Sequence, residues 1–231
     1  MAALARDAGR VNRLLGGWGA DPLWGSCYDW IVEHPTVGGA LWRAGTGSDL
    51  RLLHRAADEI GLLPAGARVL DVPCGGGVSL RGLRPGQRIG YVAADISSRM
   101  LDRTLAAARE RGVADQVETR KCDVGDLPFD DARFDLVVSL TGLHCFPDPR
   151  RAVLEMGRVL RPGGVLTGSA VLNDTGLRFE PLRRGGRAAR LIGPSGSSDD
   201  VRRWLGEAGL AEVSVTGDGA FGYFRGIRRQ R

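Results

Sequence analysis

Short apolar runs alternate with segments of helical spacing from Ala67 to the end of the chain. The runs are rich in Val, Leu, Ile and Ala and are bounded by Gly, Pro and Asp, which is typical of buried strands. They predict strands at residues 68–72, 89–94, 117–122, 134–140, 165–171, 211–215 and 221–227. Because a strand, a crossover and a strand make a parallel unit, we expect a seven-stranded, mostly parallel sheet with an antiparallel last strand.

The segments between these runs predict helices. One helix is expected to begin with residues 78–83 and a second with residues 97–98. A third is expected at residues 152–160, and a fourth after a cap formed by Ser198 or Asp199. Residues 173–197 are rich in Gly, Arg and Ser and show no firm periodicity, so they predict a variable loop. This alternation is typical of a doubly wound, Rossmann-like α/β domain, which we assign to residues 66–231.

Residues 1–65 have helical rather than strand spacing. Apolar positions recur at helical intervals from Leu4 to Leu15, and Asp49 can cap a second helix from Leu50 to Ile60. Four of the five tryptophans of the chain lie in this segment. We therefore predict an N-terminal helical cap or lid that precedes the α/β domain.

Composition sets the outer limits. A chain of 231 residues with 43% hydrophobic content can bury a full core. No apolar run approaches the roughly 18 residues that span a bilayer, and the first 20 residues lack the apolar core of a signal peptide. The four cysteines are scattered without metal-type spacing. These features predict a cytoplasmic protein with free thiols, no membrane insertion and no metal.

The stretch Val69-Leu70-Asp71-Val72-Pro73-Cys74-Gly75-Gly76-Gly77 contains the end of the first predicted strand and, after it, a loop with three consecutive glycines, which we call the glycine loop. In open α/β sheets, the loop after the first strand is the usual place for a nucleotide. The spacing disfavours NAD, because the third glycine of G-x-G-x-x-G is missing, and no P-loop motif is present. The stretch resembles [DE]-x-G-x-G-x-G, with Pro73 in the place of the first glycine.

Acidic residues follow the first three predicted strands. Asp71 ends the first, Asp95 ends the second 18 residues after Gly77, and Asp123 ends the third. A carboxylate in the position of Asp95 can accept both hydroxyls of an adenosine ribose. Asp123 can accept from the exocyclic amine of adenine. A single acid after a strand is often a helix cap, but three at successive strand ends indicate a ligand site.

Four further segments carry a family resemblance: residues 123–129, 134–139, 143–149 and 158–164. In order and spacing they are similar to the consecutive motifs of the class I S-adenosylmethionine (SAM)-dependent methyltransferases of the small-molecule type, in particular the ubiquinone and menaquinone biosynthesis enzymes. The resemblance covers about 100 residues with the glycine loop. It implies SAM as cofactor, S-adenosylhomocysteine as product, and a small-molecule acceptor as partner.

We expect the donor to contact a set of residues on the loops after the strands. Tyr28 is included because the related enzymes have a tyrosine in this position, and Ile96 and Val124 because they can flank the adenine. Leu140 and Thr141 are included because the end of the fourth strand would present their backbone groups beside the donor methyl. The full set is Tyr28, Asp71, Cys74, Gly75, Gly77, Asp95, Ile96, Met100, Asp123, Val124, Leu140 and Thr141.

The acceptor is expected to be an apolar or aromatic metabolite with an anionic group. Its ring would be enclosed by Trp24, Tyr28 and Trp30, and its charge would face Arg183, Arg184 and Arg187 in the variable segment. The alternatives are that the tryptophans only pack the N-terminal segment onto the sheet, and that the arginines are solvated and bind nothing. His144 is the candidate general base, and its alternative is a structural histidine bonded to the backbone.

Two other functions stay open. The chain could be a SAM-binding protein repurposed as a cyclase, an isomerase or a silent scaffold. It could also be a nucleic-acid methyltransferase, which only the sequence pI of about 9.5 and the basic excess after Arg151 support. The residues Thr141-Gly142-Leu143-His144 occupy the place where a base-flipping enzyme would carry an Asn/Asp-Pro-Pro-Tyr loop. We therefore expect no nucleic-acid partner, and the oligomeric state stays open.

Overall fold

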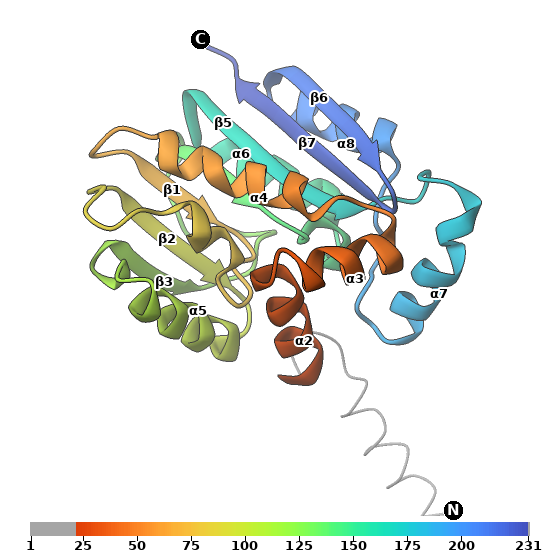
Figure 1. Cartoon of the computed structure of the whole chain (residues 1–231). Coiled ribbons are helices and arrows are strands. Elements are labelled where there is room, and N and C mark those ends of the chain that lie inside the picture. The colour runs from red at the N-terminus through yellow and green to blue at the C-terminus, as the bar shows by residue number, and fades with distance from the viewer. Residues whose placement is uncertain (1–21, 231) are drawn as a thin grey trace, which may run out of the picture.

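The computed structural model describes residues 22–230, and the side chains of residues 27–230. A single sheet of seven strands runs through it, in the order β3-β2-β1-β4-β5-β7-β6 (Figure 1). The strands are β1 (Arg68–Asp71), β2 (Gly90–Asp95), β3 (Val117–Lys121), β4 (Phe134–Ser139), β5 (Leu160–Val171), β6 (Leu210–Asp218) and β7 (Phe221–Arg228). The first five are parallel, and β7 is antiparallel to both β5 and β6. The predicted sheet is confirmed.

Helices cover both faces of the sheet (Figure 1). The α-helices are α2 (Pro22–Glu33), α3 (Val37–Thr46), α4 (Leu50–Asp58), α5 (Ser98–Glu110), α6 (Pro149–Val159), α7 (Glu180–Ala188) and α8 (Ser198–Glu207). The short 3-10 helices are η1 (Glu59–Leu62), η2 (Val78–Gly82), η3 (Ala114–Gln116), η4 (Leu143–Cys145) and η5 (Leu177–Phe179). The α2 and α3 helices lie beyond the carboxyl ends of β1 and β2, where a ligand of this fold is expected.

The central strands alternate their side chains between two cores. Val69 of β1 packs with α4 and α5, whereas its neighbour Leu70 packs with α6 and α8. Tyr91 and Val92 of β2 divide in the same way. Because successive side chains of a strand point to opposite faces and both faces are covered, the strands are apolar throughout instead of alternating with polar residues. This explains why the apolar runs of the sequence located the strands well.

The structure corrects three details of the prediction. The helix expected to begin at residues 78–83 is only the 3-10 turn η2, because Gly82 lies against the carbonyl of Ala57 and a Pro-Gly pair follows. Strand β5 begins at Leu160 instead of residue 165, because Leu160 pairs with Phe134. The variable segment 173–197 contains the helix α7, which carries the arginines.

Two helix caps show how the sequence sets local structure. The carboxylate of Asp49 accepts from the N–H of Arg51 at 3.0 Å and begins α4, as predicted. Helix α8 is capped one residue earlier than expected, because Ser197 and Asp200 form a reciprocal capping box. The predicted helix from Leu4 to Leu15 lies outside the described residues, and the division of the chain at residue 65 stays a prediction.

The N-terminal helices are packed through a glycine. A Cβ added at Gly38 of α3 would lie 1.9 Å from the carbonyl oxygen of Ile31 in α2, whereas a Cβ at Gly39 would meet nothing within 4 Å. We expect Gly38→Ala to destabilise the protein by about 1–3 kcal/mol, because α2 and α3 must separate. Gly39→Ala should instead stabilise it by about 0.5–1 kcal/mol through helix propensity. Chemical denaturation of both variants measures this, and equal effects would show that the two helices are not in contact.

Candidate cofactor pocket

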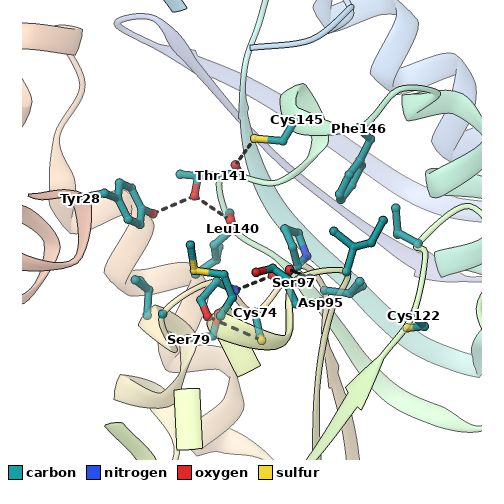
Figure 2. Close-up of a pocket in the computed structure, with 18 of the residues that line it drawn as sticks. Tyr28, Cys74, Ser79, Asp95, Ser97, Cys122, Leu140, Thr141, Cys145 and Phe146 are labelled. Atoms are coloured by element: carbon teal, nitrogen blue, oxygen red, sulfur yellow. Dashed lines mark hydrogen bonds between the residues drawn. The ribbon is translucent and has the colours of Figure 1, made fainter. Parts of the chain in front are cut away.

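A pocket of about 390 Å³ opens beyond the carboxyl ends of β1, β2, β3 and β4 and is bordered by α2 (Figure 2). Ten of the twelve residues expected to contact the donor line it: Tyr28, Cys74, Gly75, Asp95, Ile96, Met100, Asp123, Val124, Leu140 and Thr141. The volume falls in the range of roughly 300–1,000 Å³ that is usual for small-molecule sites. The structure therefore brings most of the predicted set together, at four strand ends and on the two helices α2 and α5.

Asp95 joins the glycine loop to the end of β2. One of its carboxylate oxygens accepts from the N–H of Gly75 at 3.1 Å, and the other accepts from the N–H of Ser97 at 2.9 Å. Burial raises the pKa of Asp95, and these two backbone donors partly offset the rise. Each carboxylate oxygen has two lone pairs, so both can accept a further hydrogen bond from a ligand in the pocket.

Asp71, beneath the glycine loop, and Gly77, at the end of that loop, do not line the pocket. The Asp71 carboxylate is buried and accepts from the hydroxyls of Ser79 at 3.0 Å and Tyr91 at 2.6 Å. Burial raises its pKa to about 7. Gly77 has φ of +91°, and an added Cβ would lie 3.3 Å from the Cα of Thr104 in α5. These two predicted residues hold the loop in place, and a direct contact of either with the donor stays a prediction.

Helix α2 reaches across the pocket to the loop after β4. The Tyr28 hydroxyl lies 2.8 Å from Thr141 Oγ1, which itself lies 2.8 Å from the carbonyl oxygen of Leu140 (Figure 2). Thr141 has φ of +51°, an uncommon conformation for a residue other than glycine. Burial raises the pKa of Tyr28 above its ordinary value, so its phenol stays protonated at neutral pH. Tyr28 thus lines the pocket from α2, and its contact with the donor stays a prediction.

The sequence interpretation missed Asp29, which also lines the pocket. A Cβ added at Gly76 would lie 2.0 Å from its carboxylate, so the absence of a side chain at Gly76 makes room for Asp29. The same carboxylate forms an ion pair with Arg103 of α5. Burial raises the pKa of Asp29, and Arg103 lowers it. No sequence motif marks this residue, because its role depends on where α2 packs.

The tryptophans divide by position. Trp42 is buried and stacks on Phe221 with ring centroids 4.9 Å apart, so it packs the N-terminal segment onto the sheet. Trp30 is 47% exposed, stacks on His34, and does not line the pocket. The side chain of Trp24 lies outside the described part of the structure. The contact of Trp30 with an acceptor stays a prediction.

His144 is a buried histidine behind the pocket wall. Its Nδ1 accepts from the backbone N–H of Val171 at 3.1 Å, and its ring meets the edge of Phe221. Burial lowers the pKa of His144 to about 4, so the imidazole is neutral at pH 7. It does not line the pocket. This geometry agrees with the structural alternative raised above for this residue, a histidine bonded to the backbone.

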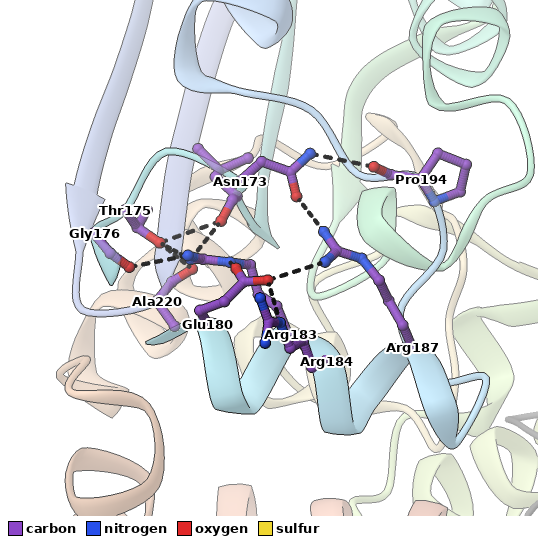
Figure 3. A network of polar contacts seen from close by, with 10 residues as sticks. Asn173, Thr175, Gly176, Glu180, Arg183, Arg184, Arg187, Pro194 and Ala220 are labelled. Carbon is purple, nitrogen blue, oxygen red and sulfur yellow. Dashed lines mark hydrogen bonds and ion pairs between the residues drawn. The ribbon is translucent and has the colours of Figure 1, made fainter. Parts of the chain in front are cut away.

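The three predicted acceptor arginines lie on α7, and most of their hydrogen bonds stay within the segment (Figure 3). Arg183 is buried and donates to the carbonyls of Leu172 and Gly176 and to Glu180. Arg184 also donates to Glu180, and Arg187 donates to Asn173. None of the three lines the pocket. In these positions they hold α7 to the strand end of β5, which argues against the expected role in acceptor binding.

Among the described residues, no group of three or more His, Cys, Asp or Glu side chains is placed to hold a metal ion. No helix within residues 22–230 is long and apolar enough to cross a membrane.

Known proteins resemble this chain in both sequence and structure. Residues 70–167 match a family described as a methyltransferase domain. The 27-O-demethylrifamycin SV methyltransferase of Amycolatopsis mediterranei is 34% identical over 205 residues, which are 84% of this chain and 70% of that protein. The demethylmenaquinone methyltransferase of Clavibacter sepedonicus is 40% identical over 165 residues, covering 71% of this chain and 58% of that one. The chain thus spans less than two thirds of the second relative.

Two solved structures share the fold. The [4+2]-cyclase SpnF superimposes with a TM-score of 0.64 at 20% identity, covering 78% of this chain and 82% of that one. A geranyl diphosphate methyltransferase in complex with SAM superimposes with a TM-score of 0.62 at 19% identity, covering 78% of this chain and 85% of that one. At these identities the likeness concerns the fold alone.

The sheet order, the glycine loop and the acidic strand ends together define a nucleotide-type pocket in a doubly wound sheet. With the extent of identity to the rifamycin enzyme, they show that the chain belongs to the class I SAM-dependent methyltransferases. The protein is therefore an enzyme of the methyltransferase class, and the family resemblance noted in the sequence is confirmed.

The low pKa of His144 predicts that the protein is less stable at acidic pH than at neutral pH. Between pH 6.5 and about 4 the unfolded imidazole binds a proton and the folded one does not, so the free energy of unfolding falls as the pH falls. The loss should reach about 3 kcal/mol. His144→Asn keeps an acceptor for the Val171 N–H and should remove this loss, while other titrating groups cancel in the comparison. Denaturant titrations of both proteins at pH 7 and pH 4.5 measure this difference. If the free energy of unfolding falls equally in both proteins between these pH values, His144 is not buried in the neutral form.

Proposed function

We propose that the protein binds SAM in the pocket between the glycine loop and α2 and transfers its methyl group to a small-molecule acceptor. The observation that carries the proposal is the position of Asp95. Its buried carboxylate ends β2, faces the pocket, and keeps acceptor capacity for the two ribose hydroxyls of the donor.

The residues present fit this cofactor. Three carboxylates, those of Asp29, Asp95 and Asp123, line the pocket, and SAM carries a sulfonium and an ammonium group. Carboxylates accept charge-assisted hydrogen bonds from such groups and from hydroxyls. Ile96 and Val124 give apolar contact for an adenine ring between them. Asp123 keeps one carboxylate oxygen available, because the other accepts from the N–H of Gly125 at 2.8 Å.

SAM supplies an already activated methyl group, which leaves the protein to position the reactants and exclude water. Tyr28 and Thr141 are placed for this, because their hydrogen bond closes α2 over the pocket. Both hydroxyls are neutral, and His144 is turned toward the backbone. We therefore propose that no side chain acts as a strong general base, and that the acceptor enters as a good nucleophile or loses its proton to water.

The sequence relatives support a small-molecule acceptor. The two relatives described above are named as methyltransferases of 27-O-demethylrifamycin SV and of demethylmenaquinone. A third, 35% identical over 121 residues, is the phthiotriol/phenolphthiotriol dimycocerosates methyltransferase of Mycobacterium leprae. We propose an acceptor of this general kind, an apolar or aromatic metabolite. Localisation in the cytoplasm and the absence of nucleic-acid partners belong to the same proposal.

Replacement of Asp95 tests the donor site. Asp95→Ala removes charge-assisted hydrogen bonds, so the affinity for SAM should fall by about 10- to 100-fold. Asp102→Ala is the matched control, because it removes the same charge from an exposed position on α5 near the pocket. Calorimetry with SAM measures both affinities, and thermal unfolding shows whether the variants stay folded. Equal affinities for the two variants would show that the adenosine lies elsewhere.

Release of S-adenosylhomocysteine tests the transfer itself. We expect the protein to release it from SAM in the presence of phenolic acceptors such as 1,4-naphthohydroquinone or 4-hydroxybenzoate. Binding of SAM without its consumption by any acceptor would instead favour the repurposed cyclase or scaffold. Failure of the wild-type protein to bind SAM would overturn the proposed function.

A further inference from the structure

The arginines of the segment 178–190 have different environments. Arg178 lies over the ring of Phe179 at 4.5 Å, and Arg183, Arg184 and Arg187 use Glu180 and nearby oxygens. Arg190 is different, because it lines the cofactor pocket. Among residues 27–230, no hydrogen bond or ion pair of its guanidinium is found. The arginine run therefore contributes one cation to the pocket, and it is not one of the three that the sequence pattern favoured.

The backbone fixes the place of Arg190. It follows the end of α7 with φ of +57°, a left-handed position at which glycine is the usual residue. The next residues are tied to η4: the Cys145 thiol donates to the carbonyl of Leu191 at 3.6 Å, and the N–H of Gly193 donates to the carbonyl of His144 at 2.7 Å. These contacts hold Arg190 beside Cys145, at an exposed rim of the pocket.

The charges of the pocket make this position distinctive. Asp29, Asp95 and Asp123 line it, and Arg190 is the one Arg, Lys or His side chain among its described lining residues. The three acids suit a donor with two positive groups. A guanidinium has five N–H donors and no acceptor, so a ligand atom that satisfies it must be an anion or another strong acceptor.

Arg190 and the glycine loop lie on opposite sides of the pocket. In Figure 2, Cys145 and Phe146 lie across the pocket from Cys74 of the glycine loop and Ser79 of η2. Arg190, held beside Cys145, is thus on the side away from the loop that the donor is proposed to contact. We propose that Arg190 binds an anionic group, a carboxylate or a phosphate, of the acceptor. This rests on the proposed function and narrows its substrate class to anionic acceptors.

The donor has a carboxylate of its own, and Arg190 could meet that group instead. The two sources differ in what they change: loss of the side chain weakens either SAM binding or the binding of an anionic second ligand. Arg190→Gly is the informative variant, because glycine accepts the left-handed backbone and only the side chain is lost. Arg184→Ala removes another exposed charge, on α7 and outside the pocket lining, and is the matched control.

The test compares two probes of the same shape, 4-hydroxybenzoate and its neutral analogue 4-hydroxybenzamide. Each is titrated by calorimetry into the wild-type protein and the variants saturated with S-adenosylhomocysteine. We expect the wild type and Arg184→Ala to bind the benzoate about 10- to 100-fold more tightly than the amide. Arg190→Gly should bind both probes equally, with unchanged affinity for SAM, and Arg190→Lys should keep part of the preference.

Three results would overturn the proposal. The first is a wild-type protein with no preference for the benzoate, whether both probes bind or neither does. The second is an Arg190→Gly variant that keeps the preference. The third is a variant that loses affinity for SAM, which would assign Arg190 to the carboxylate of the donor. None of these results would overturn the proposed function, because its own tests are SAM binding and S-adenosylhomocysteine release by the wild-type protein.

Discussion

The hydrogen bonds of the Asp95 carboxylate are the constraint on which the pocket depends. They tie the N–H of Gly75 in the glycine loop to the end of β2 and the start of α5, so the loop after one strand is positioned by its neighbour. Beneath them, the buried Asp71 connects β1 to Ser79 and Tyr91. The two carboxylates thus serve different purposes: Asp95 faces the pocket, and Asp71 supports the loop that lines it.

The phenol of Tyr28, the imidazole of His144 and the thiol of Cys74 are uncharged at neutral pH, which suits methyl transfer from a reactive donor. Burial keeps the Tyr28 phenol protonated and His144 neutral, and it raises the pKa of the Cys74 thiol. Neither Tyr28 nor Cys74 would therefore present a phenolate or a thiolate to an electrophilic methyl donor bound in this pocket. The charged groups that remain are the acids proposed to hold the donor and the single arginine at the rim.

The sequence predicted the parts of the site that follow directly from strand ends. Asp95, Asp123 and the glycine loop could be located because apolar runs mark buried strands and a ligand lies at their carboxyl ends. Contacts made by segments distant in sequence could not be found in this way. Asp29 reaches the pocket only because α2 packs against Gly76. Arg190, which follows α7, reaches the pocket, whereas Arg183 on α7 forms an ion pair with Glu180. Charge density along the chain indicated a segment that contributes a residue to the pocket, but not which of its arginines lines it.

A crystal structure of the protein with S-adenosylhomocysteine tests the central claim most directly, because it locates the donor without an acceptor. We expect the ribose hydroxyls within hydrogen-bond distance of the Asp95 carboxylate, the adenine between Ile96 and Val124, and the homocysteine between Gly75 and Tyr28. Density for the adenosine away from Asp95, or a pocket that stays empty at saturating ligand, would contradict the assignment of this pocket as the donor site.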